Sequence, residues 1–332
     1  MSKSLNDSDQ EIITPSSKRP FPTSVVGTSS AKHLFPIIKL DEPDTYAPWL
    51  DVECQGVVIK AQHLLSKNGK RTNKIFDQIE KSGGIHPFLA YDGPVIISSI
   101  MPDKTLLGFS PDSYAEMIEV LRPDSYITPD GETYFGEHAR SSREIRRMII
   151  DSERLIRLCP DSHPIGLVKG CTLQQIGTHT EALLNLGISQ FTFHASDYLR
   201  RGPAWVTDRA IQFSQIIRHK VPSFLIYGVG AMTSLQSFNF ADGFITQSHF
   251  VNAYYGRKNC DENETSPNKK ITRKEIMDIL QRIKKDIGRI KDTRGIQKEL
   301  SGYCDLFGVD YMKKTAGLLA TACEISNKKR VI

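Results

Sequence analysis

Polar residues with the chemistry of acids, bases and nucleophiles follow several short apolar runs in this chain. The candidates are Asp130, Lys169, Gly170, His194, Asp197, Gly228 and Gly230. If the runs are strands of one parallel barrel, their carboxyl ends meet at a single mouth. Carboxylates, a lysine, a histidine and backbone amides gathered there would suit recognition of a polar heterocycle, with nucleophilic or acid–base work on it.

Each candidate also has a plain structural interpretation. Asp130 belongs to a Pro-Asp-Gly turn signal, but its place after an apolar run favours function. Lys169 ends another apolar run, where a lysine is unusual. His194 is equally compatible with a buried histidine, and Asp197 with a helix cap. Asp242 begins the last strand, which favours a structural role at the bottom of a barrel.

Short apolar segments alternate with amphipathic segments from about residue 94 onward. This alternation predicts parallel strands with helical crossovers. The expected strand segments are 94–100, 125–131, 163–170, 189–197, 222–230 and 241–250, and the expected helices are 110–121, 141–158, 172–187, 206–220 and 233–240. Ser110 and Ser141 are the expected N-caps of the first two helices, the latter in a capping box with Glu144.

Two earlier runs, 34–40 and 55–60, would raise the strand number to eight and close a (β/α)8 TIM-like barrel. An open doubly wound sheet is the alternative, although no GxGxxG follows the first strand. Residues 1–30 are polar and rich in Ser and Pro, so we expect a disordered arm. The barrel is expected over 31–256, followed by a basic helical extension at 257–332 that packs on it.

Composition excludes several classes of protein. Of the 332 residues, 39% are hydrophobic and 24% are charged, which excludes a wholly disordered chain. No apolar run is long enough to span a membrane, and the first residues lack a secretory apolar core. The six cysteines form no CxxC pair, so reduced thiols in the cytoplasm are expected, without a metal or a cofactor.

The net charge of +5 is concentrated late in the chain. Residues 269–294 hold ten Lys and Arg against four Asp and Glu, a local charge of +6. Lys284, Lys285 and Arg289 are therefore candidate contacts to nucleic-acid phosphates. The alternative is a solvated helix face that serves solubility.

In four segments the chain resembles the tRNA-guanine transglycosylase superfamily. The segments that show the resemblance are SYITPDG (125–131), GLVKG (166–170), FTFHASDYLRRG (191–202) and the stretch from FLIYGVG to VNAYYG (224–256). The TPDGETY and LVKG patterns are most similar to DNA-guanine transglycosylases, found in bacteria and phages. The resemblance implies exchange of guanine in DNA for a base such as 7-cyano-7-deazaguanine, protecting the DNA from restriction in the cytoplasm, or in the host cytoplasm for a viral protein.

The resemblance also implies roles for residues. Asp130 would act on the reacting base or sugar, Lys169 and the Gly170 amide would bind the base carbonyl, and His194 and Asp197 would complete the pocket.

The chain departs from the family at two carboxylates. Ser98 stands at the first aspartate of the DSGGFQ motif, and Ile245 at the nucleophilic aspartate. Asp242 is the nearest substitute nucleophile. The family's zinc element is absent.

These departures leave alternatives open. One is a tRNA-guanine exchange enzyme, and another is a non-catalytic subunit that works beside an active partner. A third is an unrelated barrel enzyme acting on small phosphorylated metabolites, whose phosphate would lie on the loops after the last two strands. A homodimer is also left open. Two carboxylates facing one cavity would favour an enzyme over a binding subunit.

Overall fold

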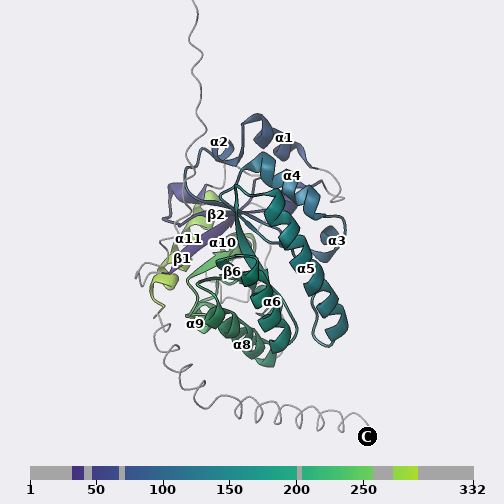
Figure 1. The fold of residues 1–332 in the computed structure, drawn as a ribbon. Coiled ribbons are helices and arrows are strands. Elements are labelled where there is room, and N and C mark those ends of the chain that lie inside the picture. The colour runs from purple at the N-terminus through teal and green to yellow at the C-terminus, as the bar shows by residue number, and fades with distance from the viewer. Residues whose placement is uncertain (1–31, 41–46, 67–71, 200–203, 257–271, 291–332) are drawn as a thin grey trace, which may run out of the picture.

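The computed structural model describes residues 32–40, 47–66, 72–199, 204–256 and 272–290 (Figure 1). Eight parallel strands pair in sequence order, and β1 pairs with β8 to close the barrel. The strands are β1 (His33–Ile38), β2 (Val57–Lys60), β3 (Val95–Ser98), β4 (Ser125–Ile127), β5 (His163–Val168), β6 (Gln190–His194), β7 (Ser223–Tyr227) and β8 (Gly243–Thr246). The predicted (β/α)8 barrel is confirmed, and the open sheet is not found.

Alternation along the strands explains why their sequences are almost wholly apolar. In β2 and β3, Val58 and Ile96 belong to the cluster that fills the barrel, whereas Val57 and Val95 belong to the larger cluster between strands and helices. Both faces of each strand are therefore buried, as in other parallel sheets. This removes the polar alternation that marks half-exposed strands.

Helices cover the outside of the barrel (Figure 1). They are α1 (Lys74–Lys81), α2 (Ile85–Leu89), α3 (Asp103–Leu106), α4 (Pro111–Leu121), α5 (His138–Leu158), α6 (Leu173–Asn185), α7 (Ser196–Leu199), α8 (Ala204–Lys220), α9 (Met232–Ser237), α10 (Ser248–Tyr254) and α11 (Arg273–Gly288), with short 3-10 turns at Pro48–Leu50 and Ala61–Leu64. Along the described ranges, no helix has the length and apolar content to cross a membrane.

Local capping explains where several helices begin. The side chain of Ser110 caps α4, as predicted, and Thr172 caps α6. The start of α5 was predicted wrongly, because this helix begins at His138 and Ser141 lies buried inside it. The Ser141 hydroxyl instead accepts a hydrogen bond from the backbone N–H of Tyr134, at 3.1 Å, and so fastens the loop between β4 and α5.

Helix α11 packs against β1, α9 and α10. Its Thr272–Glu275 capping box is present, and its buried face includes Ile276, Leu280 and Ile283. This helix therefore belongs to the wall of the barrel, within the segment expected to form an extension. The expected arm at 1–30 lies outside the described residues, as do residues 257–271 and 291–332 of the expected extension.

Candidate active site at the mouth of the barrel

A cavity of about 480 Å³ opens at the carboxyl ends of the strands. Its walls come from loops that are far apart in the sequence, after β2, β3, β4, β5, β6, β7 and β8. They include Asp103, Asp130, Lys169, His194, Gly228 and Gly230. In (β/α)8 barrels the loops at this end carry the chemistry. The volume is in the range of small-molecule sites.

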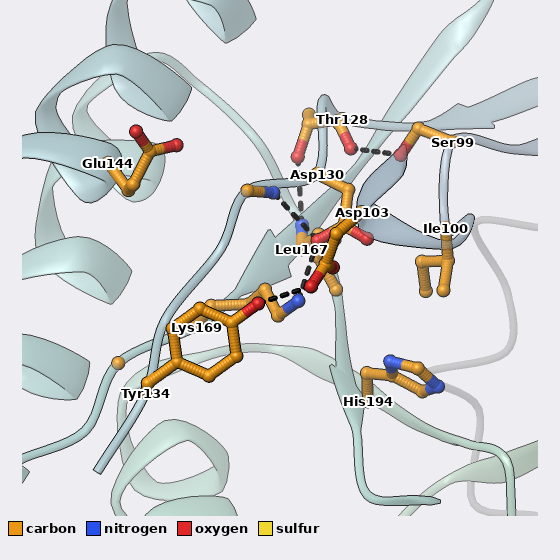
Figure 2. Close-up of polar contacts among 12 residues, drawn as sticks. Ser99, Ile100, Asp103, Thr128, Asp130, Tyr134, Glu144, Leu167, Lys169 and His194 are labelled. Atoms are coloured by element: carbon orange, nitrogen blue, oxygen red, sulfur yellow. Dashed lines mark hydrogen bonds and ion pairs between the residues drawn. The ribbon is translucent and has the colours of Figure 1, made fainter. Parts of the chain in front are cut away.

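Asp130 and Lys169 form a buried ion pair in this cavity (Figure 2). Lys169 Nζ lies 2.8 Å from Asp130 Oδ1, and the side chains are 11% and 3% exposed. The Gly131 backbone N–H donates to the same oxygen at 2.7 Å. These two contacts on one oxygen fix the orientation of the Asp130 carboxylate. The pair therefore presents an oriented carboxylate to the cavity.

Neighbouring strands fix the loop that carries Asp130. Ser99 Oγ donates to the Thr128 carbonyl at 2.7 Å, and Thr128 Oγ1 accepts from the Leu167 N–H at 2.9 Å. On the outer side, Arg147 of α5 donates to the Asp130 carbonyl at 3.1 Å. Contacts from β3, β5 and α5 thus hold this loop in place, and a rigid loop positions a reacting group better than a free one.

Asp103 is a second carboxylate on the same cavity, and the sequence analysis missed it. It begins α3, and the Tyr134 hydroxyl donates a hydrogen bond to its Oδ2 (Figure 2). This hydrogen bond is the main reason why the pKa of the Tyr134 phenol is raised above its usual value. The sequence signal that could have identified Asp103 is the Met-Pro-Asp segment, residues 101–103, soon after β3. Ser98 itself is fully buried and accepts a hydrogen bond from the Ile100 N–H.

His194 lies on the cavity beside a hydroxyl. Its Nε2 is 2.7 Å from Ser196 Oγ, and its ring stands edge-on to Tyr227 with 5.0 Å between the centroids. The structure therefore brings His194 together with Asp130 and Lys169, as predicted. The backbone of Asp197 belongs to α7, but its side chain lies outside what the structure describes.

The three predicted glycines have different surroundings. Gly228 has a φ of +89°, and a Cβ there would stand 2.7 Å from Ser196. A Cβ on Gly230 would stand 2.3 Å from the side chain of Ser248, so only glycine fits. Both glycines line the cavity. Gly170 is not among the lining residues, and its carbonyl accepts a hydrogen bond from Tyr198.

The structure places Asp242 at the opposite end of the barrel from the mouth. Its side chain accepts a hydrogen bond from the Phe224 N–H at 2.7 Å and lies 3.4 Å from Arg218, and its backbone pairs with His33 and Phe224 where the strands begin. Asp242 therefore has the structural role that its position at the start of β8 favoured. It is too far from the cavity at the mouth to act there as a substitute nucleophile. Ile245 is buried inside the barrel.

The predicted nucleic-acid contacts are not on the cavity. Lys284 lies 3.9 Å from Glu53, in the segment that leads into the start of β2. Lys285 and Arg289 are exposed in the same half of α11. The three residues therefore lie away from the mouth, toward the ends where the strands begin.

The chemistry available at the mouth follows from these contacts. Two carboxylates border one cavity, one of them held by a lysine and the other by a phenol. Paired carboxylates can divide nucleophilic and proton-transfer roles between them. Among the residues that the structure describes, no group of three or more His, Cys, Asp or Glu side chains is arranged to hold a metal ion.

Comparison with models of known protein families finds no match, and comparison with curated proteins finds no similar sequence. What the structure shows directly is the architecture: the chain forms a (β/α)8 barrel with a carboxylate-bearing cavity at its mouth.

Proposed function

We propose that this protein is a DNA-guanine transglycosylase, which exchanges a guanine base in DNA for a 7-deazaguanine such as 7-cyano-7-deazaguanine. The observation that carries the proposal is the presence of Asp103 and Asp130 on one cavity, beside Lys169. A binding subunit without catalysis has no need for two carboxylates at the mouth. The resemblance of the TPDG and YGVG segments to the transglycosylases supplies the reaction type.

Asp130 is the proposed nucleophile. An attacking carboxylate must be held in place, and Lys169 together with the Gly131 N–H contacts one oxygen of Asp130 and fixes its orientation. Asp130 would attack C1′ of the target nucleotide as the bond to the guanine ring nitrogen breaks, giving a covalent glycosyl-enzyme. The target base must first leave the stack, at a cost of a few kcal/mol.

Asp103 is the proposed proton carrier. In the first step its protonated form gives a proton to the departing guanine. In the second step the resulting carboxylate takes the ring N–H proton of the incoming base, whose nitrogen displaces Asp130 from C1′. The phenol of Tyr134 would stabilise that carboxylate by its hydrogen bond. The protons balance over one cycle, and each carboxylate returns to its starting state.

The test uses purified protein with duplex DNA labelled in guanine, or labelled tRNA, and free 7-cyano-7-deazaguanine. Released guanine is counted, and the modified nucleoside is identified by mass spectrometry. We expect exchange on DNA. Exchange only on tRNA would favour the tRNA enzyme, and no exchange on either would favour a non-catalytic subunit.

Two substitutions test the assignment of the carboxylates. Asp130→Asn keeps the shape and removes the charge, so exchange should fall about 100-fold or more, and no covalent adduct should form. Asp103→Asn should slow exchange but still allow an adduct to form. Asp77→Asn, at an exposed aspartate in the first turn of α1, is the control and should match the wild type. Full exchange by Asp130→Asn protein would refute the mechanism.

A further inference from the structure

Exposed aromatic side chains gather beside the mouth of the cavity. Among the residues that the structure describes, the exposed Phe, Tyr and Trp side chains are Tyr134, Phe135, Trp205 and Tyr254. The first three lie on the segments that follow β4 and β6, and Trp205 is in the first turn of α8. Phe135 is 38% exposed and Trp205 is 54% exposed, with 5.5 Å between their ring centroids. Apolar side chains exposed together, unlike single ones, mark interaction sites.

These rings are next to the cavity on two sides of the chain. Tyr134, which precedes Phe135, donates a hydrogen bond to Asp103, and Asp103 lines the cavity. Leu199 also lines the cavity, and the residue before it, Tyr198, packs edge-on against Phe135 with 5.6 Å between the centroids. A molecule that lies across Phe135 can therefore continue into the cavity.

Buried rings hold this surface from below. Phe135 stacks against Phe213, which is fully buried, with 6.3 Å between the centroids. Tyr198 stacks on Phe193 of β6 at 5.1 Å, and its hydroxyl donates to the Gly170 carbonyl at 3.0 Å. A ring already fixed by packing loses little conformational freedom when a ligand binds to it. The exposed rings therefore form a rigid platform.

A cation accompanies the platform. Arg209 lies one turn after Trp205 on the same side of α8, and its guanidinium is 6.0 Å from the centroid of the Phe213 ring. Arg209 makes no ion pair with any residue that the structure describes. Rings that stack on bases, with an arginine for the backbone, are the features that bind single-stranded nucleic acid. An apolar protein surface would leave this charge without a counter-ion.

We propose that Phe135, Trp205 and Arg209 bind an unpaired nucleotide next to the target guanosine, with its base stacked on Trp205 and its phosphate at Arg209. This assignment rests on the proposed function. When the target base leaves the stack, its neighbour loses a stacking partner, and an aromatic ring at the rim replaces that partner. Every base has a π face, so the platform holds the strand without reading its sequence.

The first experiment measures the affinity for a single-stranded DNA nonamer, with thymidines around one central guanosine, by fluorescence anisotropy. Trp205→Ala should weaken binding at least about fivefold, the lower end of what one stacked base contributes. Trp205→Phe should retain most of the affinity, whereas Trp205→Leu, which is apolar but has no π face, should not. Leu158→Ala, at an exposed leucine in the last turn of α5, is the control and should match the wild type.

A second nonamer locates the stacked base. It has abasic sites on both sides of the guanosine, so it lacks the neighbouring bases and keeps the phosphates. This change should weaken binding by the wild type but not by Trp205→Ala. In Trp49→Phe protein, Trp205 is the remaining tryptophan, and the intact nonamer should quench its fluorescence more than the abasic one does. The quenching measurement needs no change at Trp205, so it decides the matter even if Trp205→Ala folds poorly.

The role of Arg209 is tested by the salt dependence of the same binding. Arg209→Met should lower the slope of log affinity against log salt by about 0.7, the value of one phosphate contact in a single strand. Lys81→Met, at an exposed lysine of α1, should leave the slope unchanged.

Three results would overturn the proposal. One is the absence of nonamer binding by the wild type, and another is an equal loss from the abasic sites in the wild type and in Trp205→Ala. The third is a dimer, seen by sedimentation velocity, that Trp205→Ala abolishes, because it would assign the rings to an interface between two copies of the chain. Guanine release is measured separately. Binding that depends on Trp205 without release would contradict the proposed function alone, and release that is indifferent to Trp205 would contradict the platform alone.

Discussion

His179 lies fully buried on α6, behind the strand that carries Lys169. The Lys169 N–H donates to its Nδ1 at 3.2 Å, so this ring supports the backbone of a catalytic candidate. Burial lowers its pKa to about 4, and burial also lowers the pKa of His249 to about 3. In the unfolded chain a histidine titrates near 6.5. The folded protein therefore keeps both rings neutral where the unfolded chain would protonate them.

The buried histidines predict that the free energy of unfolding falls in weak acid. Between about pH 6.5 and 4 the unfolded chain binds more protons at His179 than the folded protein does, so the free energy of unfolding must fall as the pH falls. The contribution reaches about 1.4 kcal/mol per pH unit for one group. Urea unfolding at pH 7, 6 and 5 measures this slope. His179→Gln should flatten it, whereas exposed His219→Gln should not. Equal slopes in all three proteins would contradict the buried-histidine account.

Among the elements, the strands were predictable because each is a short β-branched or aromatic run, such as VVIK or FTFH, between helices with clear caps. Asp130 and Lys169 were predictable as neighbours, since they follow β4 and β5, which are adjacent in the barrel. Asp103 was missed because it lies five residues beyond the end of β3, in a short helix.

Other features depend on closure and not on local pattern. Lys60 and Gln247 are 187 residues apart in the sequence. Only the pairing of β1 with both β2 and β8 brings Lys60 Nζ to 2.7 Å from Gln247 Oε1. The start of α5 was misplaced for a related reason. Ser141 has the pattern of a cap, but in the fold it binds the loop of Tyr134.

The position of α11 changes the expectation for its basic residues. The sequence predicted that Lys284, Lys285 and Arg289 bind phosphates, but they lie away from the mouth, and Lys284 lies next to Glu53. Changing all three to Glu should leave the salt dependence of binding to a short guanosine-containing DNA oligonucleotide nearly unchanged, with a slope change below about 0.9, the value of one lost phosphate contact. Fluorescence anisotropy at several salt concentrations measures the slope. A larger fall would place nucleic acid along α11.

For the whole molecule, the question is whether α11 unfolds with the barrel or separately. Its apolar face packs on β1, one of the two strands whose pairing closes the barrel, and Leu280 within that face is fully buried. If the helix is part of one cooperative unit, loss of its packing destabilises every strand equally. If it is a separable extension, only the helix responds.

Leu280→Ala decides between these two cases. Removal of a buried leucine side chain leaves a cavity and should lower the free energy of unfolding of the whole barrel by about 2–5 kcal/mol. Tryptophan fluorescence, from Trp49 and Trp205, and far-ultraviolet circular dichroism should follow one coincident transition, shifted by the same amount in the variant. Gln281→Ala, at the exposed neighbouring position, should leave the transition within about 0.5 kcal/mol of the wild type. An early loss of helical signal with an unshifted fluorescence transition would instead make α11 an appendage, and the barrel would then have to be stable without it.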